Sequence, residues 1–389
     1  METTAAAKPE SENRAQSTTL PEVGVASKAV SSKRIRVPDV DWALGPGSVS
    51  WKVMADPTVF VVGLLREAIL LTLHPAFAAA AVDHDSFGDD PIGRFRHVAM
   101  YTYAATYGSK EDAERVSGMV RRRHKQIVGI EPLTLVPYRA DSEYELALTQ
   151  AMLTASFLAA YEELHGELTS RQRDQFVLEQ KVPAALLGVK PEHLPSTYGE
   201  TVDFIAHART RFATGLQARE TLSPFATSEY PAGTVIGGLP FFKRKLAMFG
   251  VRAVADMAML TMSWEELELV SINRRPKLGS RFATRAALHL LSTWFRSDKG
   301  LAVFDDFLKV HVASIYRRGL KVDTAPGGRA RAAQYQVPDA SAFVVDLPDL
   351  VTNWPGSTND YALGIEREKA AVVPAVASKQ GLRRAGSAS

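Results

Sequence analysis

The sequence predicts an all-α protein with a single large helical domain. Apolar residues recur at helical spacing through most of the chain, and the period-two alternation typical of strands is almost absent. Helix openings are also frequent: a Ser or Thr followed three residues later by Glu or Gln satisfies amides that the first helical turn leaves unpaired. Such openings stand at Ser142–Glu145, Thr169–Gln172, Thr197–Glu200 and Ser263–Glu266. We expect a helix after each of them, the second ending near Gly188.

Composition divides the chain into three parts. Residues 1–40 are rich in Ala, Ser, Thr, Lys and Glu without apolar periodicity, so we expect a disordered tail there. Residues 41–320 are the predicted helical domain, although the Gly- and Pro-bearing connection at 224–240 could also mark a boundary within it. Residues 321–389, where Gly, Arg, Ala and Pro become common, are expected to form an irregular C-terminal tail whose one strand-like run is 341–345.

Further helices are expected from apolar patterns alone. The most apolar window, 58–82, is interrupted by Arg66 and Glu67, which a membrane span tolerates poorly, so it predicts a buried core helix. Two more helices are expected at 281–295 and 304–316. We therefore expect no transmembrane segment.

The composition excludes several functional classes. The chain of 389 residues contains no cysteine, which rules out disulfides, thiolate metal sites, a Cys-ligated haem and a covalently attached haem. The net charge is only +3, with basic residues scattered among acidic ones, so we expect no nucleic-acid partner. The N-terminal segment lacks the apolar core of a secretory signal, and we expect a cytoplasmic protein. The sequence does not indicate the oligomeric state.

The best candidate site lies between residues 93 and 129. This stretch predicts two consecutive helices, the first carrying Arg94 and His97 and the second carrying Arg121 and His124. Each pair is spaced i, i+3, so its two side chains leave one side of their helix. Between the helices, Gly108 and Ser109 supply a stop and a new N-cap, with Asp112 three residues further on.

His124 is the candidate iron ligand. Val120, Ile127 and Val128 place it on or beside an apolar stripe, with Arg121 one turn earlier. An imidazole offered from an apolar helix face suits b-type haem, and an arginine can pair with a haem propionate. The pattern alone leaves another interpretation open, in which these residues form a basic, solvated helix end.

The first helix of the pair offers a second set of candidates. Arg94, His97, Val98 and Tyr101 share one face by the i, i+3, i+4, i+7 rule. These side chains could be buried and functional, or they could form a polar edge of the core.

Five runs between residues 45 and 216 carry a family resemblance. They are SWKVMADPTVFVVGLLREAILLTLHPAFAAAAVDHDSF, DPIGRFRHVAMYTYAATYG, AERVSGMVRRRHKQIVG, SFLAAYEELHGELTSRQRDQFVLEQ and LLGV…LPSTYGE. In this order they resemble the family that contains the catalytic domains of latex-clearing rubber oxygenases and the fungal mycophenolate-pathway oxygenase. The resemblance implies a globin-like helical core and a non-covalent haem b, with His124 as the proximal ligand and Arg121 near it.

The chain departs from the family pattern on the distal side. The family's Arg-x-x-Lys-Thr pattern falls on Arg94 to Val98, where His97 replaces the lysine and Val98 replaces the threonine. A further haem-supporting histidine corresponds to Gln150, and the rubber oxygenases' catalytic acidic residue has no clear counterpart. The resemblance therefore does not predict rubber cleavage.

The leading hypothesis is a haem b-dependent oxygenase that acts with O₂ on a small, unidentified apolar substrate, with an electron donor as a further partner. His124 would bind the iron, and Arg121, Val98 and Tyr101 would contact the haem. The catalytic residues would be those of the distal side, where Arg94 and His97 would polarise O₂ or transfer protons.

Two alternatives remain open from the sequence. The first is a haem-binding sensor or electron-transfer protein in which His97 and His124 both ligate the iron. The second is a haem-free helical scaffold, which the replacements at Gln150 and Val98 motivate.

Overall fold

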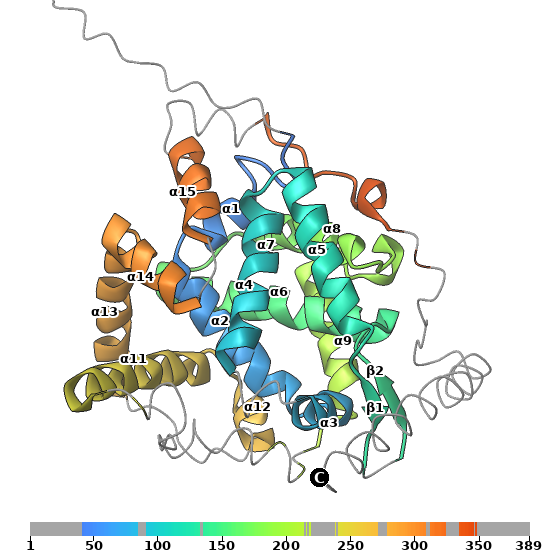
Figure 1. The fold of residues 1–389 in the computed structure, drawn as a ribbon, viewed down its shortest axis with the longest axis horizontal. Helices are drawn as coiled ribbons and strands as arrows, with labels where there is room; N and C mark the ends of the chain where they lie inside the picture. Colours follow the sequence, from blue (N-terminus) through green and yellow to red (C-terminus); the bar gives the residue numbers. More distant parts are fainter. Residues whose placement is uncertain are drawn as a thin grey trace, which may run out of the picture. The chain divides into compact units, whose positions relative to one another are not determined.

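The computed structural model describes residues 41–84, 91–132, 135–213, 215, 218, 238, 240–270, 278–308, 312–323, 334–345 and 347. All of them fall in one compact unit, Val37–Ser389. Within these residues the secondary structure is helical apart from one two-stranded sheet (Figure 1), which confirms the predicted all-α class. The tail predicted at 1–40 lies outside the described residues, as does most of 321–389, so both tails stay predictions.

The apolar window expected as one helix forms two. Helix α2 (Pro57–Leu71) and helix α3 (Pro75–Asp83) are bent by 104° relative to each other. Pro75 causes the break because it has no amide to continue the hydrogen-bond ladder, and it instead occupies the first turn of α3. Among the described residues no single helix is long and apolar enough to cross a membrane. Only α2 and α3 taken together reach the necessary length and apolar composition.

Helix α2 is buried along nearly its whole length and packs against α6 (Glu143–His165). Close approach of the two helices depends on Gly63, where an added Cβ would lie 2.6 Å from the Phe157 ring. The buried Arg66 is compensated by Glu266, whose carboxylate lies 2.9 Å from its guanidinium. The charge of Arg66 within this apolar window is therefore paired in the core.

The predicted pair of helices is confirmed as α4 (Pro91–Tyr107) and α5 (Lys110–His124). The Ser109 hydroxyl accepts the amide of Asp112 at 3.1 Å, and the Asp112 carboxylate accepts the amide of Ser109 in return. This capping box turns the chain so that the two helices pack against each other.

A short hairpin follows α5, where the sequence indicated only a break. Strands β1 (Val128–Ile130) and β2 (Pro137–Arg139) pair antiparallel, with Val128 opposite Arg139. Gly129 is required by this pairing because an added Cβ would lie 2.3 Å from the Tyr138 hydroxyl oxygen. The hairpin carries the chain from the end of α5 to the start of α6.

The four predicted helix openings are confirmed. They begin α6, α7 (Ser170–Glu179), α9 (Tyr198–Arg209) and α12 (Trp264–Leu269). The second helix, expected to run to Gly188, instead ends at Glu179, and α8 (Lys181–Leu186) follows. Pro183 explains the break, because it cannot donate to the carbonyl of Glu179 four residues earlier.

The C-terminal half differs most from expectation. Helix α11 (Phe241–Leu260) was not predicted, whereas α13 (Leu278–Phe295) confirms the helix expected at 281–295. The single helix expected at 304–316 is wrong, because two helices, α14 (Asp298–Leu308) and α15 (Val312–Asp323), occupy that region. The run expected to be strand-like at 341–345 is largely the 3₁₀ helix η2 (Ala340–Phe343). The remaining elements are α1 (Val49–Met54) and the 3₁₀ turn η1 (Pro191–His193).

Candidate functional site

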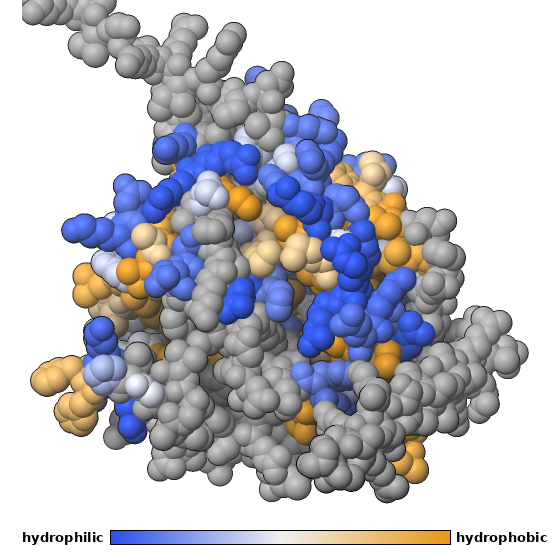
Figure 2. All heavy atoms as spheres, viewed as in Figure 1, coloured by the Kyte–Doolittle hydropathy of each residue, from blue (hydrophilic) through white to orange (hydrophobic). Residues whose placement is uncertain are grey.

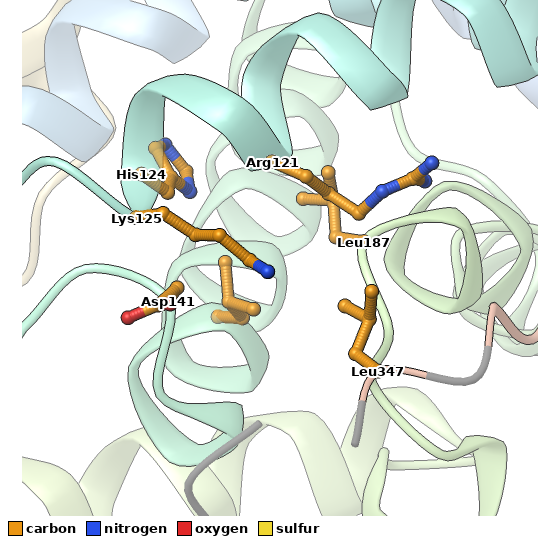
Figure 3. A pocket seen from close by; sticks show the side chains of 7 residues that line it. Arg121, His124, Lys125, Asp141, Leu187 and Leu347 are labelled. Atoms are coloured by element: carbon orange, nitrogen blue, oxygen red, sulfur yellow. The ribbon is translucent and has the colours of Figure 1, made fainter. Parts of the chain in front are cut away.

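A small hollow lies at the C-terminal end of α5, the helix that carries the predicted iron ligand. Its atoms leave about 310 Å³ of unfilled space, part of it open to solvent. The side chains around it come from α5, from the start of α6, from the end of α8 and from the C-terminal segment (Figure 3). They are Arg121, His124, Lys125, Asp141, Leu146, Leu187 and Leu347.

His124 is the last residue of α5 and is half-buried at the edge of this hollow. It ends a run of basic residues in the last turn, a placement that the negative end of the helix dipole favours. Lys125, the C-cap, extends across the hollow between His124 and the leucine side chains (Figure 3). The hollow therefore combines one imidazole and one mobile cation with an apolar wall.

Arg121 is held by two other partners of the chain. One terminal nitrogen of its guanidinium donates to the carbonyl of Leu186, at the end of α8, and the other lies 2.7 Å from the Glu114 carboxylate. The guanidinium points away from Lys125 and Asp141 in Figure 3. The contact with Leu186 fixes α5 against α8 and so orients the helix that presents His124. The contact with Glu114 lies within α5.

The wall of the hollow is continuous with a buried apolar cluster. Leu146 and Leu187 line the hollow and also belong to that cluster, together with Tyr101. Asp141 faces the hollow from the loop before α6, and its carboxylate accepts two hydrogen bonds from Arg139, each 2.9 Å long. The negative charge of Asp141 is therefore balanced by Arg139, and the rest of the wall of the hollow is mainly apolar.

The candidates on α4 do not line this hollow. His97 is exposed to solvent, Val98 packs against the main apolar core, and Tyr101 is buried in the cluster behind Leu146 and Leu187. The side chain of Arg94 lies outside the described residues. The structure thus brings Arg121 and His124 to one place and leaves His97, Val98 and Tyr101 away from it.

A chain of buried hydrogen bonds runs behind the cluster. The Tyr101 hydroxyl donates to Gln150 at 3.2 Å, Gln150 donates to Gln180 at 3.1 Å, and Gln180 donates to the Ser50 hydroxyl at 3.0 Å. Burial raises the pKa of Tyr101 well above its usual value, so its hydroxyl stays protonated. Gln150, the position where the resemblance implied a histidine, therefore both accepts and donates in this chain.

Glu145 is a titratable group that the sequence analysis did not select. It precedes Leu146 in the first turn of α6, and burial raises its pKa to about 7, with Arg211 opposing that shift. The side chain as a whole is partly exposed, but its Oε2 atom is enclosed and has no hydrogen-bond partner among the described residues. A carboxyl that titrates near neutral pH is a candidate proton donor or acceptor.

Several other residues of the hollow were also missed. Asp141 and Leu187 lie in loops whose only sequence signals are those of helix ends, and Leu347 lies in a segment expected to be irregular. Lys125 adjoins the predicted ligand and could have been proposed from that position alone.

Comparison with known proteins identifies a family that the chain matches. A family model described as "ER-bound oxygenase mpaB/B'/Rubber oxygenase, catalytic domain" matches residues 51–317, which is well over half of the chain. The match includes α4, α5 and the hollow apart from Leu347. No curated protein matches the chain, and no solved structure does.

Proposed function

Because this chain belongs to the family of ER-bound oxygenase mpaB/B' and rubber oxygenase catalytic domains, we propose that it is a haem b-dependent oxygenase whose iron is bound by His124. The family supports an enzyme that uses O₂ and an organic substrate. The haem, its ligand and the class of substrate are our proposal. A single observation carries it: a half-buried histidine ends a helix at an apolar hollow.

The chemistry of the available side chains fits haem better than non-haem iron. A non-haem oxygenase site requires two histidines and a carboxylate around one metal. Among the described residues no group of three or more His, Asp or Glu side chains could hold a metal ion. Haem b requires only one axial side chain from this cysteine-free chain, together with an apolar surface and cations for the propionates.

The size of the hollow sets a condition on this proposal. The enclosed part of the hollow measures only about 10 Å³, room for about one water molecule, whereas ligand pockets usually measure roughly 300 to 1,000 Å³. Binding of a macrocycle therefore requires the walls to separate. The Lys125 side chain can move without unpacking a helix, because Lys125 is the C-cap that follows the last residue of α5.

The chain's own residues would act as follows. His124 would bind the haem iron, and Lys125 would pair with a haem propionate. Arg121 would hold α5 in position through its hydrogen bond to the carbonyl of Leu186 in α8. Leu146 and Leu187 would exclude water and favour an apolar substrate. Haem supplies the activation of O₂ when bound.

The catalytic roles of Arg94 and His97 stay predictions from the sequence. His97 is exposed in the first half of α4, so a distal role requires it to move. This exposure gives no support to a bis-His iron with His124. An electron donor stays an expected partner from the sequence, and it would be required if one atom of O₂ is reduced to water.

The haem-free scaffold remains the second candidate, and the small hollow favours it. The two are separated by the absorption spectrum of the purified protein after haem is added. We expect a Soret band, a rise in the unfolding temperature with haem, and loss of both in His124→Ala. His97→Ala tests the distal assignment, and His207→Ala, on the exposed side of α9, is the matched control.

Each result has a defined meaning. A band that His124→Ala abolishes and His207→Ala retains supports the iron ligand. A change of spin state in His97→Ala would place that residue beside the iron. No band in the wild-type protein, with no change in unfolding temperature, would refute the proposal and leave the scaffold.

The cytoplasmic location also stays a prediction. Fractionation of cells that produce the full chain, with and without a salt wash of the membrane pellet, measures it directly.

A further inference from the structure

Helix α11 exposes an unusual stripe of aromatic and basic side chains. Phe242, Lys245, Phe249 and Arg252 follow one another at spacings of three, four and three residues, which places them on one face of the helix. Phe242 is 84% exposed and Phe249 is 63% exposed. We call these four residues the α11 face. Large aromatic side chains are rarely left in water without a partner.

The side of the same helix turned away from Phe242 and Phe249 is buried. Val254, Met257 and Ala258 belong to the main apolar core, and α11 packs against α2 and α13. Ala253, four residues after Phe249, is buried as well, so the exposed α11 face ends near Arg252. The helix is therefore fixed by its inner face, and its outer aromatic side chains are not needed for that packing. Figure 2 shows apolar atoms projecting beside hydrophilic atoms at the outer end of α11.

The charge around this face has one sign. Lys243, Arg244 and Lys245 are all exposed, and the sequence from 240 to 255 contains no Asp or Glu. The ammonium group of Lys245 lies 4.6 Å from the centre of the Phe241 ring, so cations and rings are interleaved. The first acidic residue of the helix, Asp256, is largely buried and lies 3.9 Å from Arg252.

The neighbouring helix adds exposed apolar area. On α13, Phe282 is 70% exposed and Leu290 is 74% exposed, with the exposed Ala286 midway between them. The exposed acids nearby, Glu265 and Glu268, lie on α12, which Figure 1 places beyond the C-terminal end of α11. Residues 241–255 of α11 therefore present rings and cations without a carboxylate of their own.

We propose that the α11 face docks on the surface of a lipid bilayer that contains anionic lipids. Rings inserted at the boundary between headgroups and acyl chains, with Lys and Arg at the level of the phosphates, are the arrangement of interfacial helices. Lys245 and Arg252 of the α11 face, with Lys243 and Arg244 exposed in the same turn as Lys245, match a negatively charged surface, whereas a protein partner would need a complementary acidic patch. The helix lies on the bilayer and does not cross it, in agreement with the lack of a spanning helix among the described residues.

This inference does not depend on the haem or on His124. It adds a place of action to the proposed function, since a bilayer surface concentrates apolar molecules. The haem titration and the binding test below can therefore fail separately.

The test uses the full chain and vesicles of two compositions, phosphatidylcholine alone and phosphatidylcholine mixed with phosphatidylserine, with co-sedimentation as the measurement. We expect binding to the mixed vesicles that weakens as salt is raised. Lys243→Gln with Lys245→Gln should lower the partition coefficient roughly 30-fold, at about a fivefold loss per cation. Phe242→Ser with Phe249→Ser should lower it roughly 100-fold or more.

A matched control removes the same charge elsewhere. Arg171 and Lys190 are exposed on other parts of the molecule, and Arg171→Gln with Lys190→Gln should bind like the wild-type protein. Circular dichroism and urea midpoints confirm that each variant is folded.

Three outcomes would overturn the proposal. The first is wild-type protein that does not bind the mixed vesicles. The second is equal weakening of binding by the control pair. The third is a dimer seen by light scattering that the phenylalanine changes dissociate, without any vesicle binding, which would make a second copy of the chain the partner of the α11 face.

Discussion

Asp56 offers a stability test in which charge can be separated from geometry. It caps α2, accepting the amide of Thr58 at 2.9 Å, and its carboxylate also lies 2.8 Å from the His165 ring. Burial by itself would raise the pKa of Asp56, but the hydrogen bonds from His165, Ser292 and Thr58 outweigh it and lower the pKa to about 2. The native state therefore favours the charged form of this side chain.

The magnitude follows from linkage. A fall from 3.8 to about 2 corresponds to about 2.5 kcal/mol of stability at neutral pH, at roughly 1.4 kcal/mol per unit. Because the folded-state pKa of Asp56 is below the unfolded value, this stability is present above pH ~4 and is lost as the pH falls toward 2. About half of it should remain near pH 3.

Asp56→Asn is the appropriate change, because asparagine caps a helix nearly as well as aspartate and the substitution removes mainly the charge. Urea unfolding at several pH values should show a loss of about 2 to 2.5 kcal/mol at pH 7 that shrinks to a few tenths by pH 2. Asp41→Asn is the control, since Asp41 is a largely exposed partner of Lys110 and should change stability by less than about 0.5 kcal/mol. A difference for Asp56→Asn that stays constant across the pH series would refute the reasoning.

Three further changes test the packing and the buried charges. Gly63→Ala should destabilise by about 2 to 4 kcal/mol in urea, because its Cβ would overlap α6, whereas Gly250→Ala, with no atom within 4 Å, should be neutral or stabilise by up to about 1 kcal/mol. Glu266→Gln should cost about 3 to 5 kcal/mol because it leaves the buried Arg66 without its counter-charge, and a thermal midpoint near wild type would contradict this. Glu145→Gln should have the opposite pH dependence to Asp56→Asn. The raised pKa of Glu145 makes the native state lose stability between pH ~4.5 and ~7. The variant should therefore match the wild type at pH 4 and exceed it by about 3 kcal/mol above pH 7, at roughly 1.4 kcal/mol per pKa unit. Equal stability of the two proteins at pH 8 would place the carboxyl in solvent.

The helix openings could be predicted from the sequence because their physics is local. A capping box involves two residues three positions apart, and both partners can be read from the chain, as at Ser263 and Glu266. The break after Glu179 was equally local, since Pro183 removes a hydrogen bond four residues back, but the helix periodicity around it masked the signal.

Helix α11 was missed for a different reason. Its inner face is apolar, but Phe242 and Phe249 lie on the outer face, so no single stripe stands out against a polar background. An amphipathic pattern predicts a helix whose outer face is polar. The exposed Phe242 and Phe249 obscured that pattern in α11, and they are also the residues on which the proposed membrane contact depends.

The candidates on α4 show the limit of face arguments. His97, Val98 and Tyr101 share a helical face, yet His97 is exposed and Tyr101 is buried. From Tyr101 to Tyr107 every residue of α4 is buried, whereas 95–98 lie at the margin of the core. Burial changes along this helix axis as well as around it, and only the tertiary packing determines where the change falls.

Arg121 shows the same limit for a contact. Its partner in α8, the carbonyl of Leu186, lies 65 residues away and is a backbone atom that no side-chain pattern marks. The sequence indicated that an arginine one turn before the ligand would either bind a propionate or orient the helix. The contact that was found orients the helix.

The replacement at Gln150 bears directly on the choice between haem protein and scaffold. A histidine lost from a haem pocket should leave either a cavity or an unpaired polar neighbour. The Gln150 amide accepts from Tyr101 and donates to Gln180 at hydrogen-bonding distance, so its polar neighbours are paired. A glutamine offers an acceptor and two donors, and the buried tyrosine and glutamine use one of each. A second small hollow, lined by Gln150, Gln180 and Thr201, lies beside this network, and only this hollow is consistent with a lost histidine. The argument for a haem-free scaffold then depends on these small hollows and on Val98, and the haem titration tests directly whether the protein binds haem.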